Sequence, residues 1–158
     1  MLTDEETREI QAEFVNYENR RAVCLDALRI VQQHRGWVDD LALRDVAALL
    51  GMTPAELDSV ATFYNQIFRK PVGRHVIRVC DSVSCWLIGY DQLHQRLVQS
   101  LGVELGETTS DGQFTLLPAV CLGTCDHGPA MMVDGDLYRD LEDIDIDPVL
   151  AKYREGRP

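Results

Sequence analysis

The sequence contains no run of about 18 apolar residues, the length a transmembrane helix requires, and no cluster of Lys and Arg side chains. Direct insertion into a membrane is therefore not expected. The 26 acidic and 15 basic residues give a formal net charge of −11. Because phosphate backbones and anionic membrane surfaces repel negative charge, nucleic acid and lipid surfaces are poor candidate partners.

Common signatures of catalysis and nucleotide binding are also missing. The sequence has no Walker loop, no dinucleotide-binding glycine fingerprint and no readable Ser/His/Asp set. The pattern Cys-x-x-Cys, which a thioredoxin-type dithiol needs, does not occur either. We therefore expect the isolated chain to bind neither NAD nor a phosphate substrate and to have no catalytic activity of its own.

With 158 residues, 46% of them hydrophobic, the chain can form one domain with a real core, or a domain with a compact appendage. Its first six residues are acidic and polar, unlike a secretory signal, which favours a cytoplasmic location. In a reducing compartment, five cysteines are more typical of metal ligands or buried small side chains than of disulfides.

The first 70 residues read as a bundle of four short helices, over about 3–19, 21–34, 40–50 and from 53 onward. Thr3 with Glu6 and Thr53 with Glu56 have capping-box spacing, and Asp40 is the expected cap of the third helix. Two further expectations concern apolar side chains of these helices. Cys24 shares a buried stripe with Ala27, Leu28 and Val31, while Phe63 and Tyr64 are core aromatics or, alternatively, a partner contact.

Beyond residue 70 the periodicity becomes that of an α/β layer. Strands are predicted over 75–79, 114–120, 130–133 and 137–138, and helices over 90–101 and from 148 onward. The sequence thus predicts an α/β protein with a helical segment over 1–70 and a second domain over 71–158.

Four of the cysteines fall into two tight pairs, each just beyond a predicted strand. Cys80 and Cys85 are separated by four residues, and Cys121 and Cys125 by three. Loops that leave neighbouring strands at one edge of a sheet would bring the four sulfurs together. Small residues in both loops, among them Ser84 and Gly123, would let backbone N–H groups turn towards the sulfurs.

Zinc and an iron-sulfur cluster both accept four thiolates. Structural zinc most often uses a two-residue knuckle, which neither pair has, whereas a 2Fe-2S cluster needs two ligands on each iron and tolerates wider loops. The spacing favours the cluster, with a zinc-stabilised interaction module as the alternative. Trp86, directly after a candidate ligand, would either shield the site from water or face a partner.

These residues resemble a known family, the thioredoxin-like 2Fe-2S ferredoxin subunit of the NADH dehydrogenase module of bacterial respiratory complex I. The resemblance runs from about Arg20 to Tyr153. It is carried by Ala-Thr-Phe-Tyr at 61–64, Cys-Asp-Ser-Val-Ser-Cys at 80–85, Gly89, Thr-Ser-Asp-Gly-Gln-Phe-Thr-Leu at 109–116, Cys-Leu-Gly-Thr-Cys at 121–125 and Gly128-Pro129.

The resemblance implies an N-terminal helical bundle followed by a thioredoxin-like fold in which Cys80, Cys85, Cys121 and Cys125 bind one 2Fe-2S cluster. It implies electron transfer within NADH:quinone oxidoreductase, on the cytoplasmic face of the membrane. The implied partners are the flavin-binding subunit, which holds FMN and oxidises NADH, and a further iron-sulfur subunit of the peripheral arm. Related subunits of NAD-linked hydrogenases and formate dehydrogenases are the alternative context.

Overall fold

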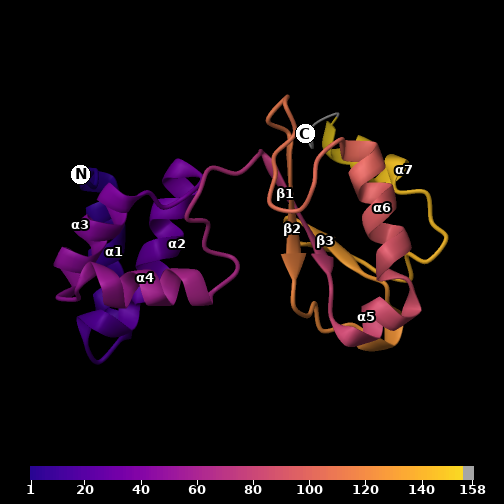
Figure 1. Ribbon diagram of the computed structural model, residues 1–158. Helices are drawn as coiled ribbons and strands as arrows, with labels where there is room; N and C mark the ends of the chain where they lie inside the picture. Colours follow the sequence, from indigo (N-terminus) through magenta and orange to yellow (C-terminus); the bar gives the residue numbers. More distant parts are fainter. Residues whose placement is uncertain (155–158) are drawn as a thin grey trace. The chain divides into compact units, whose positions relative to one another are not determined.

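The structure is a computed structural model that describes residues 1–154. It separates into two compact units, Met1–Pro71 and a second that begins at Val72. Helices alone build the first unit, and a four-stranded sheet with helices builds the second (Figure 1). The predicted fold class, α/β, is confirmed. Within residues 1–154, no helix is both long enough and apolar enough to cross a membrane.

The helical unit follows the predicted order, with one break. Its elements are α1 (Asp4–Glu13), η1 (Phe14–Asn16), η2 (Arg20–Val23), α2 (Cys24–Arg35), α3 (Asp40–Leu50) and α4 (Pro54–Phe63). The expectation that the first helix runs to about residue 19 is wrong. The Asn19 side chain accepts a hydrogen bond from the Ala22 N–H and so caps a new turn at Arg20.

The helix ends are set by local chemistry. Both predicted capping boxes, Thr3 with Glu6 and Thr53 with Glu56, are present. The third helix is capped by Asp39 rather than Asp40, because the Asp39 carboxylate accepts from the Ala42 N–H at 2.6 Å. Gly51, in the left-handed conformation, ends the same helix.

The core of this unit contains the predicted stripe of α2: Ala27, Leu28 and Val31 are fully buried, and Cys24 packs against them half-buried. The prediction that Phe63 and Tyr64 are core aromatics is wrong. They stack edge to face at the end of α4, with 79% of Phe63 and 44% of Tyr64 exposed. Neither ring belongs to the buried core of the helical unit.

The second unit comprises β1 (His75–Cys80), α5 (Val83–Ile88), α6 (Tyr90–Leu101), β2 (Phe114–Ala119), η3 (Cys125–His127), β3 (Met131–Val133), β4 (Asp136–Tyr138) and α7 (Asp147–Arg154). The strand order is β2-β1-β3-β4. β1 and β2 are parallel, and β3 is antiparallel to both β1 and β4. The helix α5 was not predicted, whereas the four strands, α6 and α7 lie close to their predicted positions.

One face of this sheet forms the core with α6 and α7, which lie on the same side of the sheet in Figure 1. Ile77 and Val79 of β1 pack with Leu97 of α6 and Leu150 of α7, all essentially without exposure. This packing fixes which residues of β1 point into the core and where the strand ends.

A buried ion pair joins two helices of the first unit. Glu6 of α1 is 1% exposed and forms a two-pronged contact with Arg35 of α2, with both N···O distances at 2.6 Å. The Thr3 N–H also donates to the Glu6 carboxylate at 2.7 Å. The guanidinium of Arg35, helped by the N–H of Thr3, holds the pKa of the Glu6 carboxyl at about 2.

Replacing Glu6 with Gln is therefore expected to destabilise the full chain at neutral pH by about 3 kcal/mol. The folded pKa lies below the ordinary value of 4.5, so ionised Glu6 stabilises the fold above that pH. The contribution disappears as the pH falls towards 2. Urea unfolding of wild type and E6Q at neutral and acidic pH should show the difference shrinking on acidification.

The matched control is Glu5→Gln, because Glu5 lies in the same helical turn but is exposed and forms a long ion pair with Arg8, at 3.7 Å. That substitution should change stability by less than about 0.5 kcal/mol. Equal effects of E5Q and E6Q would contradict the assignment.

Candidate metal centre

The parallel pairing of β1 and β2 brings both cysteine loops to one edge of the sheet. Cys80, the last residue of β1, is in register with Ala119, the last residue of β2, and Cys121 follows two residues later. The Asp81 N–H extends the pairing by donating to the Ala119 carbonyl at 3.0 Å. Figure 1 shows α5 at this end of the sheet, beyond the heads of the two strands.

The first sulfur pair is buried. Ser82 adopts an extended conformation ahead of α5, and this short helix turns Cys85 back towards the end of β1. The Cys80 side chain lies close enough to raise the pKa of the Cys85 thiol, and each residue is 2% exposed. The helix brings together two thiols that the sequence separates by four residues.

The second pair lies at the surface. The Sγ atoms of Cys121 and Cys125 are 3.8 Å apart, and both residues are exposed. Gly123 between them has φ +76°, and its N–H donates to the Cys121 Sγ at 3.3 Å. The left-handed conformation that favours glycine is what turns this N–H towards sulfur, as the small residues of the loop predicted.

The two pairs lie close enough to interact electrostatically. Burial raises the pKa of the Cys85 thiol to about 11, with smaller contributions from Cys80 and Cys125. The hydrogen bond and the charge of Cys121 raise the pKa of Cys125, while the Ser84 hydroxyl opposes this rise. Because metal ions bind thiolates, loading this site must displace protons from the thiols.

Among residues 1–154, no group of three or more His, Cys, Asp or Glu side chains gathers as one metal ion would require. What the structure contains is two sulfur pairs. His127, two residues beyond Cys125, faces carboxylates instead of the thiols, with Nδ1 at 3.1 Å from Asp140 and Nε2 at 3.5 Å from Asp126.

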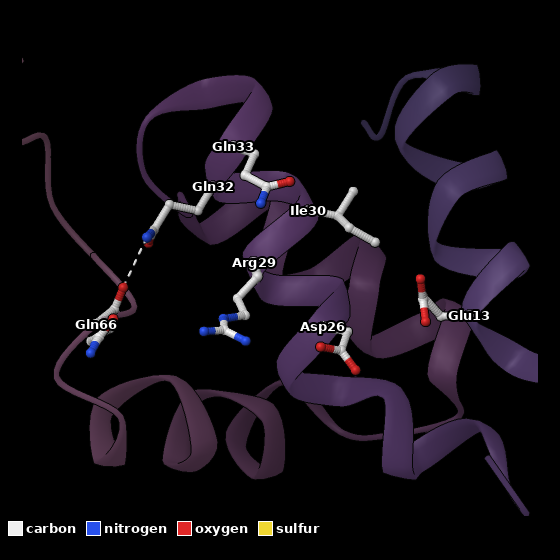
Figure 2. Close-up of a pocket in the computed structure, with 7 residues that line it drawn as sticks. All are labelled: Glu13, Asp26, Arg29, Ile30, Gln32, Gln33 and Gln66. Atoms are coloured by element: carbon white, nitrogen blue, oxygen red, sulfur yellow. Dashed lines mark hydrogen bonds between the residues drawn. The ribbon is translucent and has the colours of Figure 1, made fainter. Parts of the chain in front are cut away.

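A cavity of about 380 Å³ lies on the helical unit, and none of its lining residues is a cysteine. Figure 2 shows that its side chains are mostly polar and come largely from α2. The Gln32 side chain donates to the Gln66 carbonyl at 2.8 Å and accepts from the Phe68 N–H at 2.6 Å. These bonds fix the segment after α4 to α2, and the cavity adds no group to the thiol site.

Comparison with known proteins agrees with this chemistry. The model of the family described as thioredoxin-like [2Fe-2S] ferredoxin matches residues 10–154. The chain belongs to this family. It is also similar to relatives that are all named as one and the same subunit of NADH-quinone oxidoreductase. It is 48% identical to that of Escherichia coli K12 and 45% to that of Pseudomonas aeruginosa, over 97% of this chain and 92% of each relative.

A solved structure, an NAD+-reducing [NiFe]-hydrogenase in the air-oxidised state, has a similar fold, with a TM-score of 0.70 and 27% identity. The match covers 85% of this chain but only 23% of the hydrogenase chain. Family membership favours the 2Fe-2S cluster over the zinc alternative.

The residues around the thiols fit the cofactor of a 2Fe-2S ferredoxin. Four sulfurs in two pairs match the two ligands that each iron requires. Besides Gly123, the backbone N–H of Ala130 donates to the Cys85 sulfur and lowers the pKa of its thiol. Both N–H groups favour thiolate over thiol, which is the form that binds iron. No pattern in the sequence predicted that Ala130 and α5 would be part of the site.

The second loop passes very close to the buried pair. A Cβ added at Gly128 would lie 3.2 Å from the Cys85 Sγ and 3.4 Å from the Cys85 Cα and Ile88 Cδ1. Gly128 has φ −80°, so its own backbone conformation suits any residue. An added Cβ would be crowded here, and Cys85 would have to shift by a few tenths of an ångström to make room for it.

Replacing Gly128 with Ala is expected to push Cys85 out of position and to lower the cluster content of the purified protein at least several-fold. The overpacking should also cost about 1–3 kcal/mol of stability. Iron and acid-labile sulfide analysis, together with visible absorption, measures the first effect, and urea unfolding the second.

Gly135→Ala is the control, because a Cβ at Gly135 meets nothing within 4 Å. If G128A retained as much cluster as G135A, the close approach would not matter for the site.

Proposed function

We propose that this chain is an electron-transfer subunit of NADH:quinone oxidoreductase that holds one 2Fe-2S cluster on Cys80, Cys85, Cys121 and Cys125. The observation that supports the proposal is that both sulfur pairs follow parallel strands that end at one edge of the sheet. The near full-length similarity to the NADH-quinone oxidoreductase relatives supports the choice of complex. Residues 71–158 would be the cluster domain and residues 1–70 a helical appendage.

Each sulfur pair would bind one iron, Cys80 with Cys85 and Cys121 with Cys125. When bound, the cluster supplies one-electron transfer, and its reduction adds one negative charge to the four thiolates. The Gly123 N–H donates to a sulfur of one pair, and the Ala130 backbone lowers the pKa of a thiol of the other pair, so each iron would have a backbone dipole that stabilises the added charge.

The partner that exchanges electrons with this cluster would be the subunit that holds FMN and oxidises NADH. Several large apolar side chains next to the thiols are exposed: Val83 by 66%, Trp86 by 57%, Leu87 by 73% and Val120 by 77%. We call these four residues the apolar rim. Exposed apolar side chains grouped around a functional site are typical of a protein interface.

Trp86 is exposed, which favours its facing a partner over its shielding the thiols from water. Docking through the apolar rim would exclude water from the exposed Cys121–Cys125 pair and shorten the distance to the flavin. A further iron-sulfur subunit of the peripheral arm would complete the assembly, on the cytoplasmic face of the membrane.

The second candidate is the equivalent subunit of an NAD-linked hydrogenase or formate dehydrogenase. The similarity to the NAD+-reducing [NiFe]-hydrogenase supports it, although at 27% identity against 45–48% for the NADH-quinone oxidoreductase relatives. Purifying the complex through a tag on this chain and identifying the other subunits separates the two functions. Hydrogenase or formate dehydrogenase subunits would overturn the first.

Replacing Cys80 or Cys121 with Ala should abolish the cluster, because three thiolates cannot supply the two protein ligands that each of the two irons needs. The red-brown absorption and the EPR signal of the reduced protein should disappear, along with bound iron and sulfide. Cys24→Ala is the matched control. Cys24 is half-buried in the helical core, so its loss should leave the cluster intact. Wild-type iron and sulfide in C80A would contradict the ligand assignment.

Leu87→Asp should weaken co-purification with the flavin-binding subunit at least tenfold, because it places a charge in the apolar rim. Its iron content should remain that of wild type. Ile144→Asp, at an apolar side chain that is 44% exposed outside the rim, should co-purify normally. Equal recovery of the partner with both variants would exclude the rim as the docking surface.

A further inference from the structure

The sheet of the second unit has a second face, opposite α6 and α7. Pairing places four residues in one row across it: Leu117 of β2, Arg78 of β1, Met132 of β3 and Leu137 of β4. We call this row the Arg78 face. Side chains alternate along a strand, so Ile77 and Val79 point into the core and Arg78 points away from it. Figure 1 shows α6 and α7 on one side of the sheet, and the core residues of these helices pack with Ile77.

The apolar members of the Arg78 face are partly open to solvent. Leu117 and Met132 are half-buried, and Leu137 is 39% exposed. The row is therefore an apolar strip with a cation at its centre, on a side of the sheet that the core helices leave free.

Arg78 is buried, and the part of the chain that the structure describes offers it no ion pair. It is 7% exposed, and among residues 1–154 it forms no salt bridge. Its contacts are long: Nη2 lies 3.5 Å from the Asp134 carbonyl oxygen and Nη1 4.0 Å from the Met132 Sδ. Its buried Nε has no hydrogen-bond partner within the described residues.

The carboxylate of Asp134 forms no ion pair with the Arg78 guanidinium. Burial lowers the pKa of Arg78, and the negative charge of Asp134 offsets this only in part. That carboxylate is already engaged, since it accepts from the Val76 N–H at 2.9 Å and contacts the His75 Nδ1 at 2.8 Å. It therefore acts on Arg78 from a distance and forms no direct contact with it.

Other arginines with low exposure in this chain have hydrogen-bond or ion-pair partners for their guanidinium groups. Arg35 forms an ion pair with the Glu6 carboxylate, and Arg69 contacts both Asp40 and Asp58 within 2.8 Å. The Arg96 guanidinium donates to three backbone carbonyls between Leu141 and Ile144. Arg78 therefore differs from its counterparts, and a buried cation without a paired acid is costly unless something outside the chain completes it.

The surroundings of Arg78 identify the chemistry of that missing group. A guanidinium binds a carboxylate with two parallel hydrogen bonds, and the two Nη atoms of Arg78 make only long contacts within the described residues. Leu117, Met132 and Leu137 around it favour apolar side chains, which a protein segment supplies and a free anion does not. A second copy of this chain is disfavoured because the charge of −11 makes two copies repel each other.

We propose that the Arg78 face is a docking surface for a neighbouring subunit, which packs an apolar segment on it and places one Asp or Glu carboxylate on the Arg78 guanidinium. The proposal rests on the proposed function, in that it requires the chain to be part of a multisubunit complex. This surface is distinct in its residues from the apolar rim around the thiols.

Arg78→Met tests the proposal by two measurements that should move in opposite directions. Methionine keeps the apolar bulk and removes the unpaired charge, so the isolated full chain should unfold at a higher urea concentration than wild type. Binding to the rest of the complex, purified without this chain and titrated with it, should weaken at least tenfold. Iron and sulfide content should be that of wild type.

Arg139→Met is the matched control, because Arg139 is also in the second unit but is exposed. It should leave both unfolding and binding unchanged. If R78M bound as tightly as wild type, or if R78M lowered the stability of the isolated chain, the proposal would be overturned. If wild type itself failed to bind the purified complex, the proposed function would fail instead.

A photo-crosslinker placed at Leu137 in the assembled complex identifies the occupant. The expected product joins Leu137 to a peptide of another subunit that contains Asp or Glu. Changing that acid to Lys together with Arg78→Glu should restore binding that either change alone removes. A crosslink to a second copy of this chain, or only to peptides without an acidic residue, would overturn the proposal.

Discussion

The site depends on the register between two parallel strands. Cys80 is paired with Ala119, and because parallel strands end at the same edge, the loops that follow them start side by side. A shift of one residue would turn Cys80 towards the core face and send Ile77 to the opposite face. The packing of Ile77 and Val79 against α6 and α7 therefore fixes the position of the thiols as well as the core.

The two sulfur pairs have different environments, and the difference suits a protein that passes electrons to another. Burial of Cys80 and Cys85 raises the pKa of the Cys85 thiol and anchors one side of the site in the fold. Cys121 and Cys125 lie at the surface, where a partner can approach closely. The chain needs no substrate pocket for this task, and the four thiols lie outside the cavity on the helical unit.

Two arginines of low exposure show how differently one residue type can be used. Arg35 has its carboxylate within the same unit, so its contribution is to stability of the helical bundle. Arg78 lacks a paired acid in the part of the chain that the structure describes, and its flanking residues are apolar. Arg35 stabilises the fold of its own unit, whereas Arg78 has the properties of an interface residue before its partner is bound.

The sequence by itself determined the features that depend on neighbouring residues. Both capping boxes, the glycine after α3 and the strands that lead to Cys80 and Cys121 follow from local preferences, which a single sequence displays. Only the tertiary structure decided the rest. The turn that α5 gives Cys85, the exposure of Phe63 and the burial of Arg78 depend on which surfaces meet in space. Burial is a property of those distant contacts, and no local pattern encodes them.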